Sequence, residues 1–286
     1  MTDAEPFVKW VGGKRGLVDR ITENMPATFE DYYEPFVGGG ALFFSLADRI
    51  KKATISDRNV ELMITYKVIQ KHPLKLIEIL KQHKENHSEK YYYEVRATNP
   101  DDPIETAGRF IYLNKTCYNG LYRVNNSGIF NVPMGSYDNP LIVQEENIMA
   151  CHKALKNTTI LSGDFENIEP KANDFVYFDP PYHPTTEASF TKYTKEDFAE
   201  TEQSRLRDFI AILTKRGVKV MLSNSKTDFI NELYSSKSFF TTVVDASRMV
   251  NCKPNKRNRV EELLITNYPI VIKQLVLNEA RNTSQL

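Results

Sequence analysis

The segment Asp179-Pro180-Pro181-Tyr182 is the part of this sequence best suited to chemistry. It follows the apolar run Phe175–Phe178, which is typical of a buried strand. A carboxylate at the carboxyl end of such a strand points into the crevice where open α/β sheets bind ligands. The two prolines carry no N–H donors, so the turn presents carbonyl oxygens beside the carboxylate. We therefore expect an acceptor cluster, capped by the Tyr182 ring, for a flat substrate with an exocyclic amino group. An ordinary Pro-Pro turn with an exposed Asp179 is the alternative.

A glycine-rich turn indicates a second ligand. Gly38-Gly39-Gly40 follows the strand-like run Tyr32–Phe36 and precedes a helical pattern from Ala41 to Ala47. Bare backbone at such a turn lets a cofactor lie against the chain. The glycine spacing does not match a dinucleotide fingerprint, whereas Asp57, 17 residues after Gly40, suits ribose hydroxyls. The sequence predicts an adenosine compound without a pyrophosphate as cofactor, and a plain tight turn is the alternative.

The order of elements predicts an α/β fold with a doubly wound, mostly parallel, Rossmann-like sheet. Strand-like runs alternate with helical patterns such as Asp197 to Lys215, which favours a parallel sheet. Two late runs, Phe239–Val244 and Val260–Ile265, are joined by a loop and fit an antiparallel edge pair. The parallel runs are Tyr32–Phe36, Ala53–Asp57, Thr159–Leu161, Phe175–Phe178 and Val218–Leu222.

The alternation stops between Asp57 and about Ala150, which predicts an inserted domain. This region begins with helical patterns at Val60–Ile69, Leu74–His83 and Glu105–Leu113. We expect a discontinuous catalytic domain formed by residues 1–57 and 151–270, a mainly helical recognition domain at 58–150, and a C-terminal tail at 271–286.

Within the insert, residues 109–137 have the composition of a nucleic-acid contact. Arg109, Lys115 and Arg123 occur there with many Tyr and Asn residues and no acid. Residues 121–124 and 129–132 flank a polar turn, which indicates a β-hairpin able to enter a DNA groove. A second acid-free basic stretch spans residues 246–260. Together they suggest one charged face for a phosphate backbone, although ordinary surface loops are the alternative.

Five motifs in this order closely resemble the Dam type of DNA adenine-N6 methyltransferase, which acts on GATC. The resemblance covers about Phe7 to Tyr268 and implies a class I fold that uses S-adenosylmethionine, which contains no pyrophosphate. The motifs are Phe7–Lys14, Glu34–Ala41, Asn119–Arg123, Gly163–Phe165 and Asp179–Tyr182.

The resemblance also implies roles for individual residues. Asp179, Pro180 and Tyr182 would form the catalytic group. Trp10 and Lys14 would hold the methionine part of the cofactor, and Asp57 its ribose. The remaining cofactor positions would be Glu34, Phe36, Gly38, Gly40, Asp164, Phe165 and Asp179. The DNA-binding positions would be Lys9, Tyr118, Asn119, Leu121, Arg123 and Pro133, with Lys9 and Arg123 as guanine readers. Tyr122 and His183 depart from the pattern and are interpreted as variable positions.

The chemistry expected at the turn needs no metal. Hydrogen bonds from N6–H to Asp179 and to the Pro180 carbonyl would aim the nitrogen lone pair at the methyl group. The target adenine lies inside a duplex, so it must be flipped out of the stack. Tyr182 would then stack on the base, and Tyr118 could fill the hole in the duplex.

Composition bounds the remaining classes. The 37 basic and 37 acidic residues cancel, and three separated cysteines fit neither a disulfide framework nor a zinc site. We expect a cytoplasmic monomer that binds double-stranded DNA and no membrane. Methylation of RNA or protein, and an inactive DNA-binding regulator, are the alternatives. An ATPase is disfavoured because Gly12-Gly13-Lys14 lacks the Walker spacing.

Overall fold

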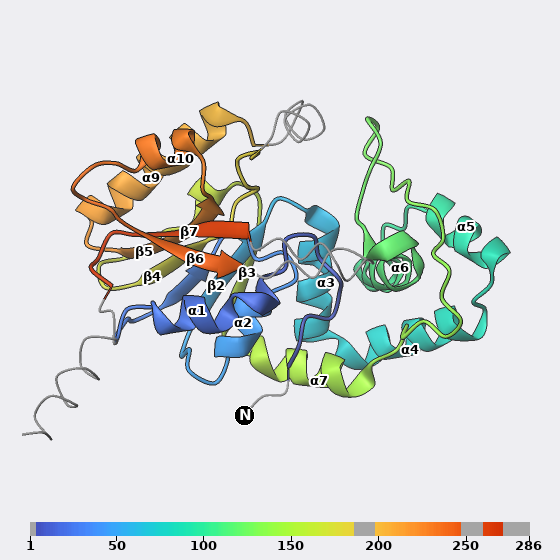
Figure 1. Cartoon of the computed structure of the whole chain (residues 1–286). Helices are drawn as coiled ribbons and strands as arrows, with labels where there is room; N and C mark the ends of the chain where they lie inside the picture. Colours follow the sequence, from blue (N-terminus) through green and yellow to red (C-terminus); the bar gives the residue numbers. More distant parts are fainter. Residues whose placement is uncertain (1–3, 186–197, 247–259, 271–286) are drawn as a thin grey trace, which may run out of the picture.

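The structure is a computed structural model that describes residues 4–185, 198–246 and 260–270. Its centre is a seven-stranded sheet of order β3-β2-β1-β4-β5-β7-β6 (Figure 1). The strands β1 to β5 are mutually parallel, and β7 runs antiparallel to both β5 and β6. The predicted doubly wound sheet with a late antiparallel pair is confirmed. The strands are β1 (Tyr32–Glu34), β2 (Ala53–Asp57), β3 (Thr158–Ser162), β4 (Phe175–Phe178), β5 (Lys219–Ser225), β6 (Phe240–Ala246) and β7 (Val260–Thr266).

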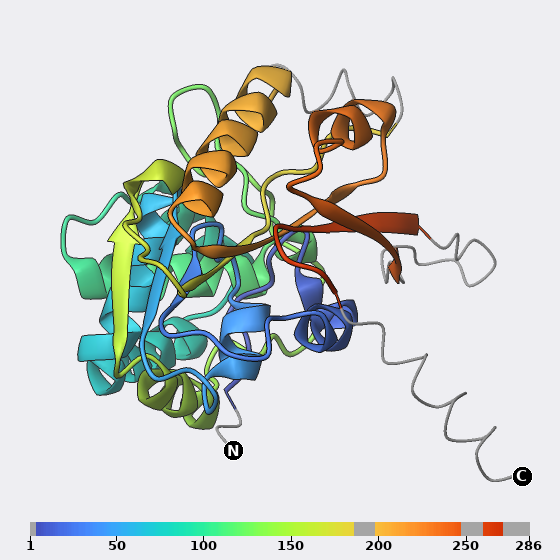
Figure 2. The same ribbon diagram turned by 90° about the vertical axis from the view of Figure 1, so that its left-hand side faces the viewer.

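Helices cover both faces of the sheet (Figure 2). On β4, Phe175 and Tyr177 pack into the cluster that contains α1, α2, α3 and α7, whereas Val176 and Phe178 pack into the cluster with α9 and α10. Because side chains alternate along a strand, a central strand covered on both faces is apolar throughout. The sheet helices are α1 (Val18–Glu23), α2 (Ala41–Leu46), α3 (Val60–Lys71), α7 (Glu145–Ala154), α9 (Glu200–Lys215) and α10 (Asp228–Leu233).

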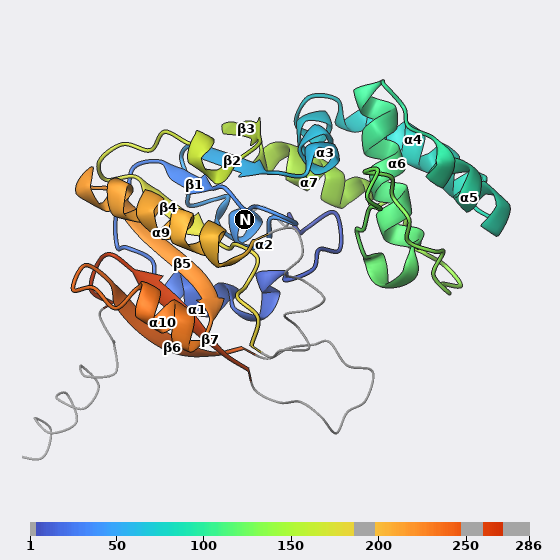
Figure 3. The ribbon, with the colours of Figure 1, turned by 90° about the horizontal axis from the view of Figure 1, so that it is seen from above.

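Three further helices, α4 (Pro73–Glu85), α5 (Glu89–Ala97) and α6 (Pro103–Thr116), lie beyond α3 (Figure 3). The helix α3 contacts β2 and β3 on one side and α4 and α6 on the other. One continuous hydrophobic cluster therefore runs from the sheet into the helical segment. The helices predicted within the insert correspond to α3, α4 and α6 and are confirmed. The helix α5, which begins after a Ser88 cap, was not predicted. The division into two domains stays a prediction.

The predicted hairpin forms with less regular pairing than expected. Val124 and Phe130 make a single antiparallel bridge, and the Asn131 amide donates to the Arg123 carbonyl. The Asn125 side chain accepts hydrogen bonds from the amides of Ser127 and Ile129, so the side chain closes the turn. The segment projects beside α6 (Figure 1).

One part of the charge prediction is wrong. Arg109 is only 5% exposed and forms an ion pair with Glu61 at 3.0 Å, because it lies on the inner side of α6. It also donates to the carbonyls of Val95 and Arg96, so it is not available to a DNA backbone. The Lys115 ammonium donates to Gln144. Residues 247–259, within the second basic stretch, and the predicted tail at 271–286 lie outside the described residues.

Candidate active site and cofactor site

Asp179 follows the last residue of β4, next to the point where the strand order reverses between β1 and β4. Its carboxylate oxygen lies 2.8 Å from the Lys14 ammonium, and both side chains are largely buried. The same ammonium is 4.3 Å from the centre of the Tyr182 ring and donates to the Gly12 carbonyl at 3.0 Å. Carboxylate, cation and aromatic face thus meet at the predicted acceptor cluster.

Glu262 belongs to this cluster and was not predicted. Its carboxylate accepts a hydrogen bond of 2.7 Å from the Tyr182 hydroxyl, which fixes the orientation of the ring. Glu262 is buried on β7, which β5 separates from β4, and it is 80 residues from Tyr182 in sequence. No local pattern marks this glutamate, because Glu261 and Glu262 are adjacent at the start of the strand and nothing in the sequence distinguishes the buried one from the exposed one.

The charges around Asp179 set its protonation. Burial raises the pKa of Asp179 to about 6, the nearby Lys14 ammonium acts in the opposite direction, and the negative charge of Glu262 adds to the rise. Asp179 is therefore mainly ionised at neutral pH and loses its charge as the pH falls through about 6.

The glycine turn after β1 leaves no room for side chains at two of its positions. Gly38 has φ +47°, and a Cβ there would lie 2.5 Å from the Trp10 ring. Gly40, at φ +74°, has no room for a Cβ because it would lie 2.5 Å from the Tyr66 hydroxyl oxygen. The Gly38 amide donates to Asp57 at 3.1 Å, which ties the turn to the end of β2. Burial raises the pKa of Asp57, whereas this amide and those of Asn59 and Arg58 lower it.

Glu34 ends β1 and lies within the protein core. The Tyr32 hydroxyl donates to its carboxylate at 2.7 Å. Burial raises the pKa of Glu34 to about 8, against the effect of the Tyr32 hydrogen bond, and the charge of Asp179 contributes to the rise. The contact of Glu34 with the cofactor stays a prediction.

The segment after β3 contains Asp164 and Phe165, whose predicted contact with the cofactor stays a prediction. The Asp164 carboxylate accepts hydrogen bonds from Arg58 and from Arg205 at 2.6 Å, and from the Glu166 amide at 3.0 Å. Partial burial acts to raise the pKa of Asp164, but these donors outweigh it and hold the pKa below its usual value. The Phe165 ring is buried and stacks on the Phe36 ring. Of the two rings, only that of Phe36 is half-buried.

Lys9 contacts the residues at the end of α6 although more than 100 residues separate them in sequence. The buried Asn114 side chain accepts from the Lys9 amide at 2.8 Å and donates to the carbonyls of Lys9 and Gly120. The Lys9 stem fills the space beside Gly120, where a Cβ would lie 2.6 Å from Lys9 Cδ. The Lys9 ammonium lies over the Tyr137 ring. Asn114 therefore joins the N-terminal segment to the end of α6.

The other predicted DNA contacts form one exposed group after α6. Tyr118 is 54% exposed, and its amide donates to the carbonyl of Pro133, which is also exposed. Asn119 has φ +56°, which turns the chain sharply, and Leu121 is half-buried. The Arg123 guanidinium is exposed and donates to Asn131 Oδ1 at 2.7 Å.

Tyr122, interpreted as a variable position, has a structural role. Its ring stacks on Trp10 at 5.9 Å between centroids, and its hydroxyl donates to Glu61 at 2.9 Å. It therefore packs the hairpin against the segment that covers Gly38.

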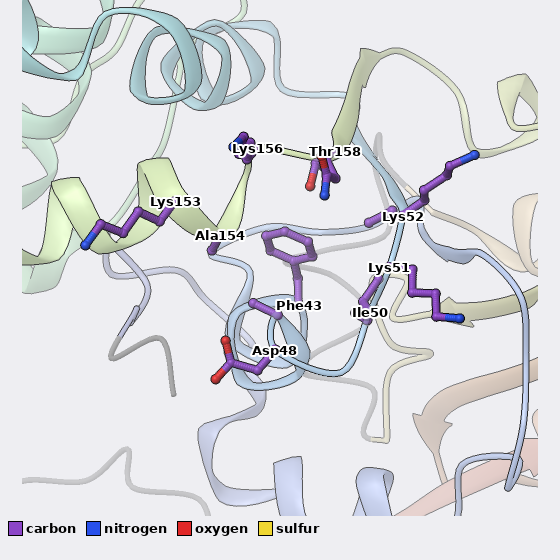
Figure 4. A pocket seen from close by; sticks show the side chains of 12 residues that line it. Phe43, Asp48, Ile50, Lys51, Lys52, Lys153, Ala154, Lys156 and Thr158 are labelled. Carbon is purple, nitrogen blue, oxygen red and sulfur yellow. The ribbon is translucent and has the colours of Figure 1, made fainter.

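A separate cavity of about 160 Å³ opens near the start of β2 and β3, away from Asp179 (Figure 4). Phe43 forms part of its wall, and four lysines line it. Lys153 and Lys52 point away from one another, so the cavity has no converging set of donors.

Two absences concern the described part of the chain. No group of three or more His, Cys, Asp or Glu side chains there could hold a metal ion. Nor does any of its helices have the length and apolar character needed to cross a membrane.

Comparison with known proteins identifies the family. Residues 10–250 match the model of the D12 class N6 adenine-specific DNA methyltransferases. The chain belongs to this family. It is 46% identical over 290 residues to the Type II methyltransferase M.MjaIII of Methanocaldococcus jannaschii, covering 93% of this chain and 100% of the relative. It is 44% identical to M1.LlaDCHI of Lactococcus lactis subsp. cremoris, covering 92% of this chain and 95% of the relative. Identity to the DNA adenine methylase of Escherichia coli is 32%, covering 93% and 96%.

The D12 family membership gives the chain its activity and cofactor: adenine-N6 methylation of DNA with S-adenosylmethionine. The site suits this cofactor in three respects. A glycine turn too tight for a side chain lies beside Asp57, Phe36 offers an aromatic surface, and Lys14 supplies a cation for a carboxylate. The expected class I fold agrees with the strand order.

Glu262→Gln should shift the pH dependence of methyl transfer. The neutral amide still accepts from Tyr182 but removes a charge that raises the pKa of Asp179, so the acid limb of the rate profile should move to lower pH. The measurement is the single-turnover rate on duplex DNA at pH values around 6. Glu261→Gln is the matched control, because Glu261, the exposed neighbour of Glu262, pairs with Lys226 instead. An unmoved acid limb in Glu262→Gln would contradict the expectation.

Glu34→Gln should remove a pH-dependent loss of stability. The pKa of Glu34 is raised from 4.5 to about 8 in the folded chain, so the folded state holds its proton more tightly than the unfolded state. Wild-type stability is therefore lost progressively as the pH rises through this window, whereas glutamine has no proton to lose. Urea unfolding near pH 4.5 and near pH 8 should show the variant gaining on wild type at the higher pH. Glu78→Gln, at an exposed position, is the control. A gain in stability that is the same at both pH values would show that ionisation of the buried Glu34 is not its cause.

Proposed function

We propose that this methyltransferase acts on the adenine of GATC in duplex DNA, with Asp179, Pro180 and Tyr182 in contact with the target base. The GATC assignment follows from the resemblance of its five motifs to Dam-type enzymes. The observation that carries the proposal is that the Asp179 carboxylate and the Tyr182 ring both contact the Lys14 ammonium, at the end of β4 next to β1.

The acceptor cluster is suited to hold and orient an amino group. The ionised Asp179 and the Pro180 carbonyl accept the two N6 hydrogens, while the Tyr182 ring, held by Glu262, stacks on the base. This alignment directs the nitrogen lone pair outward and supplies much of the rate enhancement. When bound, S-adenosylmethionine supplies the methyl group that the nitrogen attacks.

Lys14 contacts the same carboxylate and the same ring that the target amine would use. The target amine and the Lys14 ammonium are thus alternative donors to Asp179. In the proposed role, Lys14 pairs with the carboxylate of the cofactor, which leaves Asp179 for the base. Before cofactor and substrate arrive, the Lys14 ammonium keeps Asp179 ionised, since a nearby cation favours the charged form.

The DNA-reading role falls to Lys9 and the segment from Tyr118 to Pro133. Its support is the exposure of Tyr118 and Arg123 beside Lys9, which Asn114 holds in place. A flipped adenine leaves a gap in the stack, and the exposed Tyr118 ring is of a size to fill it. Arg123 and Lys9 would donate to the acceptors of guanine in the major groove.

Asp179→Ala should abolish methyl transfer and leave cofactor binding measurable. The variant loses the N6 acceptor, whereas the glycine turn and Asp57 are untouched. Methylation of GATC duplex and calorimetric titration with S-adenosylhomocysteine are the two measurements. The exposed Asp101→Ala serves as control, and substantial methylation by Asp179→Ala would refute the proposed role.

Arg123→Ala should relax discrimination at a guanine position of the site. Loss of a side chain that reads a base costs ~1–3 kcal/mol of discrimination against the wrong base. The measurement compares kcat/KM on GATC with its value on duplexes that differ at one base pair. Arg20→Ala, an exposed arginine on α1, is the control. Unchanged discrimination by Arg123→Ala would exclude Arg123 as a reader.

A further inference from the structure

Two buried amides hold the turn that follows Asp179. Gln203 lies on α9 and Asn224 on β5, and both are 0% exposed. The Gln203 side chain donates to the Pro181 carbonyl at 2.9 Å, and the Asn224 side chain accepts from the His183 amide at 3.1 Å. The two side chains are joined by a hydrogen bond of 3.0 Å from Asn224 Nδ2 to Gln203 Oε1. We refer to Gln203 and Asn224 as the amide pair.

The orientation of the amide pair is determined by the backbone. Asn224 Oδ1 accepts from two main-chain amides, those of His183 and Ser225. Its oxygen must therefore face the backbone, and its nitrogen must face Gln203. Gln203 in turn presents its oxygen to Asn224 and its nitrogen to Pro181. Each assignment requires the next, so the hydrogen bonds run in one direction from β5 to the turn.

The amide pair affects which of the two proline carbonyls in the turn can accept a further hydrogen bond. The prolines remove two backbone donors, and the carbonyls they leave can both serve as acceptors. The Pro181 carbonyl is already bonded to Gln203. Among the described residues, no donor to the Pro180 carbonyl is found. The amide pair thus occupies one acceptor, whereas no described residue donates to the other, which directly follows Asp179.

We infer that Gln203 and Asn224 are positioning residues for methyl transfer. By holding the Pro181 carbonyl and the His183 amide, they fix the Pro180 carbonyl and the Tyr182 ring in place for the target amine. The inference rests on the proposed function, in which these groups contact adenine. Neither residue touches the reacting atoms itself. They are 22 and 41 residues from their partners in the turn.

The test uses Asn224→Asp and Gln203→Met in the full-length chain. Asp at 224 still accepts from the backbone but cannot donate to Gln203, which then reverses and turns its oxygen toward Pro181. Met at 203 keeps the approximate shape and removes the donor. We expect kcat to fall by about 10- to 100-fold in each variant, because a displacement of about 1 Å costs rates of this order. Affinity for S-adenosylhomocysteine and the fluorescence rise of 2-aminopurine at the target position should be retained.

Asn267→Asp provides a matched control. The Asn267 amide also bridges α9 and β5, through Thr214 and the backbone of Val218 and Val220, but at the end of β5 remote from the turn. Its replacement should lower thermal stability without lowering kcat. The double variant Asn224→Asp/Gln203→Met should be no slower than the slower single variant, since both act through one carbonyl.

The inference is overturned if kcat is retained in the two single variants. It is also overturned if their loss of kcat is matched by Asn267→Asp, or if it follows a loss of cofactor binding, because either result would indicate a purely structural role. Additive losses in the double variant would likewise exclude a shared carbonyl. Substantial methyl transfer by Asp179→Ala would instead refute the proposed function, so the two failures are distinguishable.

Discussion

Asp179 carries a negative charge in a buried position, and the surrounding structure is arranged to permit this. Burial alone raises the pKa of its carboxyl group, and the Lys14 ammonium at 2.8 Å opposes that rise. Lys14 belongs to the N-terminal segment, so this segment must lie across the carboxyl ends of β1 and β4. Trp10 packs on Gly38, and Asn114 holds the Lys9 backbone. The ion pair at the site thus requires the sheet, the glycine turn and the end of α6 to be in place together.

The sheet could be predicted because its determinants are local. The run Phe175–Phe178 is apolar at each position, which is the pattern of a strand covered on both faces, and the structure places it at the centre of the sheet. The hairpin was less predictable in detail. Its turn is closed by the Asn125 side chain, which replaces ladder hydrogen bonds that regular strands would make.

The parts of the site that the sequence revealed are those at strand ends. Asp57 ends a parallel strand, and Asp164 and Asp179 come just after two others, so the topology alone brings them to one edge of the sheet. Glu262, Gln203 and Asn224 gave no such signal. They lie within a strand or a helix, where a polar residue is unremarkable, and their importance depends on partners distant in sequence.

Arg109 illustrates the opposite error. Its neighbours in sequence suggested a surface charge, but the helical period of α6 turns it toward Glu61. Charge counted along a sequence is therefore a poor guide to charge on a surface when the segment is helical.

The acceptor cluster cannot by itself select adenine. A carboxylate, a carbonyl and an aromatic ring suit any flat molecule with an amino group. The Lys14 ammonium already contacts two of these groups, the carboxylate and the ring. Selection must therefore come from what delivers the base to the cluster. The link with the right geometry is Asn114, which bonds Lys9 at one side and Gly120 at the other. Lys9 and Lys14 share one segment, so Asn114 connects the segment that carries the cation beside Asp179 to the turn at Gly120. In the proposed function, the groups that would read the DNA and the cation beside the base acceptor are therefore parts of one connected structure.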